Sequence, residues 1–258
     1  MKPPSVLAIS SFAVHGTASL KTFITILGER VLPVPSLILN GLTNMALVKK
    51  FDTPFKELLR SSLDLAVNRN LDLILYIGYL GKAEQAYVIL EAINQYRSHI
   101  KTIITDPVCG DHGRTYVPDE VVKKWPSIIE QSDIVFPNQT EVKVLTGNKP
   151  DAIAETSYYI AQFNQRFPNT KLVITSIKNG EDTIGIQVTG DNPYFYTHHV
   201  LPKNFGGSGD AFLALFILNH FYKDLSFNDA LKLAADQTYR VIESSIKKGS
   251  DDLVLEIH

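Results

Sequence analysis

The amino-acid sequence predicts an α/β fold in which helices cover both faces of a mostly parallel sheet. Short β-branched or aliphatic runs alternate with longer helical stretches over about 200 residues, and this alternation is typical of strand–helix–strand units. The last third is helical, and residues 183–189 and 194–200 have the alternating pattern of a hairpin near the sheet edge. No repeat, low-complexity tract or flexible linker interrupts the chain, so we expect one domain over residues 1–258.

Strands are expected where apolar residues form short continuous runs. "SVLAISS" and "LDLILYIGYL" lack the polar alternation of a half-exposed strand, as buried strands of parallel sheets do. The expected strands are residues 5–11, 30–39, 71–80, 100–108, 132–138 and 170–176, followed by the hairpin of 183–189 and 194–200.

Helices are expected where apolar residues recur at helical spacing. Residues 53–69 have apolar residues at helical spacing, namely Phe55, Leu58, Leu59, Leu63 and Ala66. Gly28 supplies a C-terminal stop for the first helix. The expected helices are residues 16–28, 53–69, 83–97, a short helix after 138, 151–167, 208–222 and 226–248.

The composition argues against several classes of protein. The chain has 258 residues, 45% of them hydrophobic and 20% charged, and a net charge of −2, which leaves no basic field for nucleic acid. No apolar stretch reaches the roughly 18 residues that a membrane span requires. The start "MKPPSVLAIS" lacks a signal-peptide pattern, and the single cysteine, Cys109, has no partner for an intrachain disulfide. A cytoplasmic location is therefore the expectation.

The clearest candidate for a site is the stretch "NFGGSGD" at residues 204–210. The first N–H groups of a helix are unpaired and carry roughly half a positive charge, and glycines before a helix let an anion approach the backbone. Gly207, Ser208 and Gly209 are therefore a candidate anion cradle, with Asp210 in the first helical turn. Asp210 would suit a base that takes a proton from an alcohol while the amides stabilise the transferred group.

Other interpretations of this stretch compete with the anion cradle. Glycines before a helix often form only a turn, and Asp210 could be only a cap. A Walker loop requires GxxxxGK[ST], which the chain lacks. A nucleophile elbow requires GxSxG, whereas "GGSGD" has Asp210 in place of the last glycine and Pro202 interrupts the preceding strand. The sequence thus disfavours a serine hydrolase.

Two further polar loops follow strands. "TDPVCGDHGRTYVP" contains Asp106 and Asp111, and "DIVFPNQTEVKVLTG" places Asn138 and Glu141 three residues apart at a helix start. The second pair is either a capping box or a place where a carboxylate binds Mg²⁺ through water. Ligands of such sheets bind at the carboxyl ends of strands, so these loops and the anion cradle together fit phosphoryl transfer.

Five motifs resemble those of the vitamin B6 kinases (pyridoxal kinases) of the ribokinase superfamily. They occur in that family's order and span residues 78 to 212: "GYLGKAEQ", "DPVCGDHGRTYVP", "SDIVFPNQTEVKVLTG", "VITS" and "GGSGDAF". The resemblance implies a three-layer α/β/α sandwich, ATP with Mg²⁺, and phosphorylation of a primary alcohol on a pyridine-like ring. It also implies that the 5′-hydroxymethyl group of pyridoxal is the acceptor, as in pyridoxal 5′-phosphate salvage.

The resemblance also implies a role for each matching position. Asp210 would be the base, and the amides of Gly207, Ser208 and Gly209 the anion hole. Residues expected at the nucleotide and its phosphates are Asp106, Asp111, Tyr116, Asn138, Glu141, Thr175 and Ser176, with Asp111 and Glu141 near the metal, partly through water. Residues expected around the vitamin ring are Ser11, Thr43 and Tyr79. Relatives of this type are usually homodimers, which is the expectation here.

The substrate half departs from the family pattern. The loop at residues 40–43 reads "NGLT" instead of Ser-Asn-His-Thr, and Ser19-Leu20 replaces a usual Gly-Asn. "LKTF" at residues 20–23 instead resembles the hydroxymethylpyrimidine kinases of thiamine synthesis, although those usually carry cysteine where this chain has Asp210. Two alternatives therefore stay open: a hydroxymethylpyrimidine kinase, and a paralogue that binds vitamer or nucleotide without turnover. The preferred vitamer, a requirement for a monovalent cation such as K⁺, and a reaction of Cys109 with the aldehyde are open as well.

Overall fold

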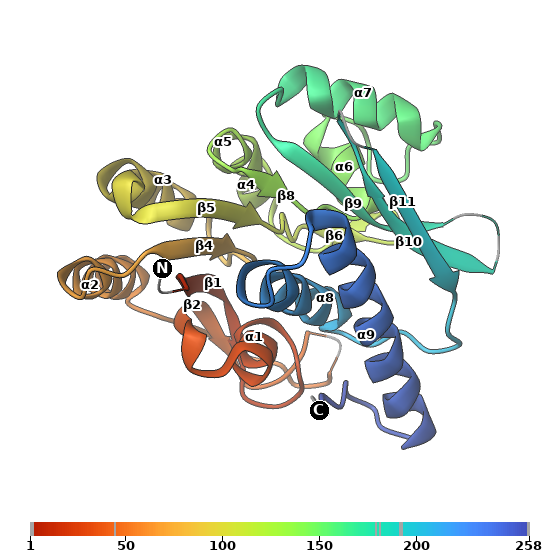
Figure 1. Cartoon of the computed structure of the whole chain (residues 1–258), viewed down its shortest axis with the longest axis horizontal. Helices are drawn as coiled ribbons and strands as arrows, with labels where there is room; N and C mark the ends of the chain where they lie inside the picture. The colour runs from red at the N-terminus through yellow and green to blue at the C-terminus, as the bar shows by residue number, and fades with distance from the viewer. Residues whose placement is uncertain (1–2, 44, 179, 181, 191–192, 257–258) are drawn as a thin grey trace. The chain divides into compact units, whose positions relative to one another are not determined.

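A computed structural model describes residues 3–43, 45–178, 180, 182–190 and 193–256 of the chain (Figure 1). The chain divides into two compact units. The terminal unit consists of Met1–Leu73 and Leu201–His258, and the middle unit is Ile74–Val200. The expectation of one domain over the whole chain stays a prediction.

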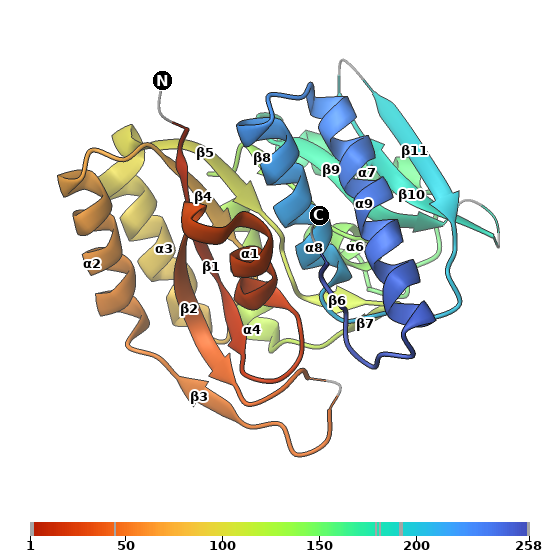
Figure 2. The ribbon, with the colours of Figure 1, turned by 60° about the horizontal axis from the view of Figure 1, so that its bottom comes forward.

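The terminal unit contains one parallel strand pair with an added antiparallel strand. β1 (Ser5–Ala13) pairs in parallel with β2 (Val31–Leu39), and β2 pairs antiparallel with β3 (Lys50–Asp52). Its helices are α1 (Ser19–Leu27), the 3₁₀ turn Gly28–Arg30, α2 (Phe55–Asn68), α8 (Ser208–Ile217), the π-helical turn Leu218–Tyr222 and α9 (Phe227–Lys247). Helix α1 packs against α8, and α8 against α9 (Figure 2).

The middle unit is built on strands in the order β11-β10-β9-β8-β5-β4. β8 pairs in parallel with β5 and β9, whereas β10 is antiparallel to β9 and β11. The strands are β4 (Leu73–Ile77), β5 (Ile100–Thr105), β8 (Ile134–Val135), β9 (Lys171–Lys178), β10 (Thr183–Val188) and β11 (Tyr194–His199). A separate small hairpin joins β6 (Gly110–Asp111) to β7 (Arg114–Thr115).

Helices flank the strands of the middle unit. They are α3 (Ala83–Tyr96), the 3₁₀ turn Arg97–His99, α4 (Asp119–Val122), α5 (Trp125–Ile129), α6 (Gln139–Leu145) and α7 (Thr156–Arg166). The α/β class with a mostly parallel sheet and flanking helices is thereby confirmed. No helix among the described residues combines the length and the apolar character that crossing a bilayer requires.

Several element boundaries differ from the expected ones for local reasons. The first helix begins at Ser19 instead of residue 16, because Gly16 has a left-handed φ of +87° and Ala18 is extended. The strand expected at 132–138 pairs as β8 over only Ile134–Val135 before Pro137. The strand β3, the hairpin β6–β7 and the short helices α4 and α5 were not expected, because two to five residues carry too little periodicity to be recognised.

Candidate active site

The glycine stretch forms the N-terminus of α8, as the sequence predicts. Gly207 is the N-cap with a left-handed φ of +89°, and a Cβ there would lie 2.2 Å from the carbonyl oxygen of Thr17. Both the conformation and the space therefore require glycine. At Gly209, by contrast, a Cβ would meet no heavy atom within 4 Å. The open side of this first turn is thus at Gly209, next to Asp210.

Asp210 lies in the first turn of α8, and its carboxylate also contacts the start of α1. The backbone N–H of Ser19 donates to Oδ2 of Asp210 at 2.8 Å. The carboxylate is therefore held at the N-terminal ends of two helices, where negative charge is favoured. Burial raises the pKa of Asp210 to about 6, and the Ser19 hydrogen bond opposes that rise. An ionised carboxylate with this pKa is suited to accept a proton near neutral pH.

Of the residues expected around the vitamin ring, the terminal unit holds Ser11 and Thr43. Ser11 is buried in β1, and its Oγ donates to Oγ of Ser19 at 2.9 Å. Ser11 is thus linked to Asp210 through Ser19, whose N–H donates to the Asp210 carboxylate. Thr43 is exposed in the loop after β2. The side chain of Asn40 closes that loop, because it donates to the carbonyl of Leu47 at 3.2 Å and accepts from the N–H of Lys49 at 2.6 Å.

Asn138 and Glu141 form the capping box that opens α6. Oδ1 of Asn138 accepts from the N–H groups of Thr140 and Glu141 at 2.8 and 3.0 Å, and Oε2 of Glu141 accepts from the N–H of Asn138 at 2.9 Å. The same two side chains also bind the start of the β6–β7 hairpin. Oε1 of Glu141 accepts from Cys109 and Gly110 at 3.0 and 3.5 Å, and Nδ2 of Asn138 donates to the carbonyl of Gly110 at 2.8 Å.

This arrangement gives Glu141 a structural task besides any role at a ligand. The residue is 2% exposed, and burial raises its pKa while the backbone N–H donors oppose the rise. Both carboxylate oxygens already accept hydrogen bonds from amides. Such a carboxylate fits a hydrated Mg²⁺ better than direct coordination, since Mg²⁺ prefers oxygen ligands and keeps several of its waters.

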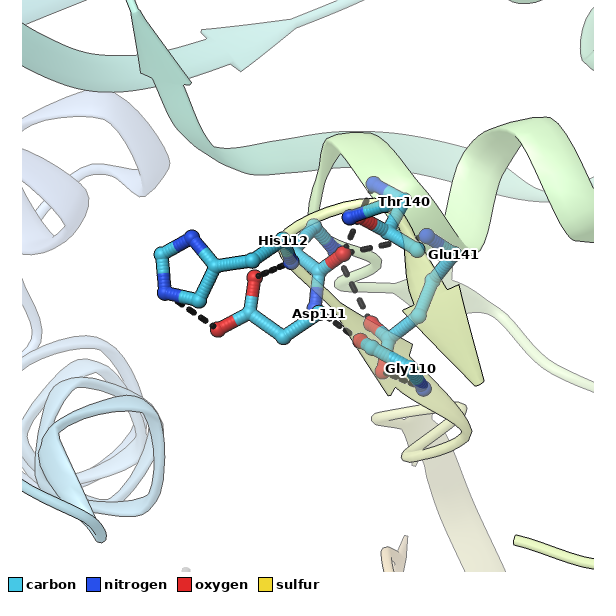
Figure 3. Close-up of polar contacts among 7 residues, drawn as sticks. Gly110, Asp111, His112, Thr140 and Glu141 are labelled. Carbon is cyan, nitrogen blue, oxygen red and sulfur yellow. Dashed lines mark hydrogen bonds and ion pairs between the residues drawn. The ribbon is translucent and has the colours of Figure 1, made fainter. Parts of the chain in front are cut away.

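The β6–β7 hairpin holds the other acidic residue expected near a metal, Asp111. Figure 3 shows the ring of His112 turned back toward the carboxylate of Asp111. Oδ1 of Asp111 accepts from the N–H of His112 at 2.8 Å, and Nε2 of His112 lies 3.5 Å from Oδ2. The N–H of Gly113 donates to Oγ1 of Thr140 at 2.9 Å and ties the turn to α6. Within the described ranges, no three or more His, Cys, Asp or Glu side chains gather as a metal-binding group.

The remaining expected residues of the middle unit lie just after strands or, for Thr175 and Ser176, within β9. Asp106 directly follows β5, and its N–H donates to the carbonyl of Ile77 at 2.8 Å. Thr175 forms a parallel bridge with Asn138, and Ser176 has a left-handed φ of +56° at an irregularity in the β9–β10 pairing. Tyr79 is buried just after β4. Tyr116 follows β7, and its side chain is 55% exposed.

Cys109 has the environment of an inert thiol. Its side chain is fully buried, and burial, with the nearby carboxylates of Glu141 and Asp106, raises the pKa of the thiol far above its usual range. Because only the thiolate is nucleophilic, this environment argues against a covalent adduct with an aldehyde.

Two contacts near the glycine stretch carry no signal in the sequence. Ser19 bonds to Asp210 although the two residues are 191 positions apart. Lys203, four residues before Gly207, donates from Nζ to the carbonyl of Ser250 at 2.6 Å and to Oδ1 of Asp251 at 3.2 Å. It thereby ties the loop before α8 to the C-terminal segment. Neither pairing can be inferred from the sequence, because the partners are far apart along the chain.

Comparison with known proteins agrees with these features. The phosphomethylpyrimidine kinase family model matches residues 20–255. Pyridoxal kinase from Arabidopsis thaliana is 29% identical over 263 residues, covering 96% of this chain and 82% of that protein. Pyridoxal kinase from Dictyostelium discoideum is 30% identical over 235 residues, covering 83% of this chain and 77% of that protein.

The fold is shared with solved structures as well. Pyridoxal kinase from Leishmania donovani in complex with ADP and pyridoxamine superposes with a TM-score of 0.83 at 19% identity, over 98% of this chain and 90% of that one. The likeness in fold and the matched family model agree with the motifs of the glycine stretch and the two acidic loops. The chain therefore belongs to the phosphomethylpyrimidine kinase family, and within the ribokinase superfamily to the pyridoxal kinases.

Proposed function

We propose that the chain transfers the γ-phosphoryl group of ATP to the 5′-hydroxymethyl group of pyridoxal, giving pyridoxal 5′-phosphate and ADP. The observation that carries this proposal is Asp210, a carboxylate with a raised pKa in the first turn of a glycine-led helix. Family membership supports it, because the curated relatives are pyridoxal kinases. A solved relative that shares the fold binds ADP and pyridoxamine.

In the proposed reaction Asp210 takes the proton of the hydroxymethyl group. The alcohol oxygen then bonds to the γ-phosphorus, and the bond from that phosphorus to the bridging oxygen of ADP breaks. Backbone N–H groups of Gly207, Ser208 and Gly209 receive the charge on the transferred group, since a helix N-terminus provides unpaired donors and a favourable dipole. The open space at Gly209 is where an anion can come close to the backbone.

The nucleotide side of the proposal uses residues of the middle unit. We assign the phosphates and base of ATP to Asp106, Asp111, Tyr116, Asn138, Glu141, Thr175 and Ser176. Asp111 and Glu141 would hold Mg²⁺, Glu141 through water, and the cation would supply charge neutralisation on the phosphates. Ser11, Thr43 and Tyr79 are assigned to the vitamin ring. A homodimer, a cytoplasmic location and a single domain belong to the same proposal and rest on likeness to the family.

The test of the proposed function is Asp210→Asn, assayed with ATP and pyridoxal. Loss of the base is expected to lower kcat by about 10²–10⁴-fold, while the affinity for pyridoxal and ATP stays largely intact. Asp64→Asn, at an exposed position on α2, is the matched control and should leave kcat unchanged. Turnover of Asp210→Asn close to that of the wild type would overturn the assignment.

A hydroxymethylpyrimidine is the second candidate acceptor, because the matching family model is that of phosphomethylpyrimidine kinases. Parallel assays with pyridoxal, pyridoxine, pyridoxamine and hydroxymethylpyrimidine at equal concentrations separate the two readings. The larger kcat/KM identifies the acceptor. If none of the four alcohols stimulates ATP consumption, the chain is instead a protein that binds vitamer or nucleotide without turnover.

A further inference from the structure

Ser19 occupies a strained position between β1, α1 and α8. Its φ of +51° lies in the left-handed region, which residues with a Cβ adopt unfavourably. It also forms an antiparallel bridge with Phe12 of β1. A strained conformation persists only where surrounding contacts over-determine it, so the contacts of Ser19 identify what holds it.

Two hydrogen bonds connect Ser19 to residues of the proposed site. Its hydroxyl accepts from Oγ of Ser11 at 2.9 Å, and its backbone N–H donates to Oδ2 of Asp210 at 2.8 Å. Ser11 is 4% exposed, so its hydroxyl hydrogen bond is protected from competing water. The two bonds form a chain from Ser11 through Ser19 to the carboxylate.

The segment before Ser19 is also fixed against α8. A Cβ on Gly207 would lie 2.2 Å from the carbonyl oxygen of Thr17 and 2.9 Å from Cα of Ala18. The backbone of the turn therefore touches the N-cap of α8 directly. Close packing at Gly207 and the hydrogen bond at Asp210 together fix the position of the turn relative to the start of α8.

We propose that Ser19 is a positioning residue for Asp210. Its N–H holds Oδ2 so that the other carboxylate oxygen, Oδ1, faces the alcohol, and the Ser11 hydroxyl keeps Ser19 in the left-handed conformation that aims this N–H. The proposal rests on the proposed kinase function in assigning Asp210 as the base. Ser11 then acts on the base through Ser19, in addition to its assigned contact with the vitamin ring.

Two substitutions at Ser19 separate positioning from a role of its hydroxyl at the substrate. Ser19→Gly keeps the N–H and adopts a left-handed backbone freely. Ser19→Ala keeps the N–H but loses the hydroxyl that Ser11 holds, so the turn can relax. We expect Ser19→Ala to lower kcat by about tenfold, the effect of weakening one hydrogen bond to a charged group, and Ser19→Gly to lose clearly less. Thr25→Ala, exposed on the same helix, is the control and should not change kcat.

The pH profile provides a readout that a merely structural role would not move. The Ser19 hydrogen bond lowers the pKa of Asp210, so the acid limb of kcat/KM should move to higher pH in Ser19→Ala and stay near the wild-type position in Ser19→Gly. The KM for ATP should not follow this pattern. Equal losses in both variants, or the same acid limb in all three proteins, would overturn the proposal.

A second measurement requires no substrate. The difference in unfolding free energy between a protein and its Asp210→Asn variant, followed against pH, reports the pKa of Asp210 by linkage. The difference changes with pH up to the pKa of Asp210 in the folded state. Because weakening the Ser19 hydrogen bond raises that pKa, we expect the difference to keep changing to a higher pH in the Ser19→Ala background. An identical curve in both backgrounds would contradict the proposal. If the wild-type chain phosphorylates none of the alcohols, the proposed function fails, while this titration still decides the role of Ser19.

Discussion

The carboxylate of Glu141 accepts a hydrogen bond from the backbone N–H of Cys109 at 3.0 Å, so α6 holds the loop that follows β5. The same carboxylate also accepts from Gly110 and Asn138. A residue that resembles a metal ligand in sequence is therefore also the clamp of the β6–β7 hairpin.

Replacing Glu141 should consequently affect stability and nucleotide use together. Glu141→Gln replaces one carboxylate oxygen with an NH₂ group. This NH₂ group then faces a backbone N–H group, so two donors meet and neither has an acceptor. We expect a loss of about 1–3 kcal/mol in the free energy of unfolding and a higher KM for ATP, measured by urea unfolding and steady-state kinetics. Glu130→Gln, at an exposed position after α5, should change neither quantity. A normal stability with a raised KM would show that the clamp contributes little.

The pKa of Asp210 sets the expected pH dependence of activity. Because Asp210 must be ionised to act as the proposed base and its pKa is about 6, kcat/KM for the alcohol should fall below this pH and reach a plateau above it. The measurement is kcat/KM between pH 5 and 9 with a thermal-unfolding control at each value. An acid limb near pH 4, the ordinary range of an aspartate, would contradict the raised pKa.

The same shift has a consequence for stability with the opposite sign. The folded state holds the Asp210 proton more tightly than the unfolded chain does, because the pKa of this carboxyl group is near 3.8 in the unfolded chain. Ionisation between about pH 4 and 6 therefore destabilises the fold, by at most about 3 kcal/mol. We expect Asp210→Asn to raise the melting temperature above pH 6 although it lowers kcat. An unchanged or lower melting temperature at pH 8 would argue against this linkage.

Gly207 and Gly209 should respond oppositely to alanine. In Gly207→Ala the new methyl group would clash with the carbonyl oxygen of Thr17, and alanine would have to adopt the left-handed backbone of Gly207. The free energy of unfolding should therefore fall by more than about 1 kcal/mol. Gly209→Ala finds open space and should be neutral or stabilising by up to about 1 kcal/mol. Its kcat/KM should nevertheless drop at least about tenfold, because the methyl group would fill the space through which the phosphoryl group is proposed to approach the backbone. A stable Gly209→Ala variant with full activity would show that the phosphoryl group does not approach the backbone at Gly209.

Lys203 links the loop before α8 to the C-terminal segment, and its removal should loosen the glycine stretch. Lys203→Met keeps an unbranched side chain over the ring of Phe205, where the ammonium now lies 4.9 Å from the ring centroid, but loses the contacts to Ser250 and Asp251. We expect about 1 kcal/mol less stability and a severalfold lower kcat. Lys223→Met, at an exposed position, is the control; equal effects of both variants would remove the special role of Lys203.

The thiol of Cys109 should be dispensable. Its burial and raised pKa predict slow reaction with iodoacetamide in the folded state. Cys109→Ala should keep the kcat and the KM for pyridoxal and lose only packing, about 1 kcal/mol of stability. A selective rise in the KM for pyridoxal would instead indicate contact between the thiol and the aldehyde.

Much of the fold and of the site was accessible from local sequence patterns. Continuous apolar runs identified β1, β4, β5 and β9, and helical spacing identified α2, α3 and α9, because each of these signals lies within one element. The capping box of Asn138 and Glu141 and the position of Asp210 in a first helical turn were also local, since a cap depends on residues three positions apart. The short elements β3, β6, β7, α4 and α5 were not predicted, because two to five residues span too few periods to show a pattern.

By itself, the sequence determined the α/β class, the glycine-led start of α8 and the acidic loops after the strands. Only the tertiary structure decided which groups meet. The hydrogen bond from Ser19 to Asp210 spans 191 positions, and that from Cys109 to Glu141 spans 32. Both donors are backbone N–H groups, which every residue except proline carries, so no residue type marks them. The sequence marks Asp210 as the candidate base, whereas the raised pKa of its carboxyl group arises from burial, and a backbone N–H that packing brings to it fixes one of its oxygens.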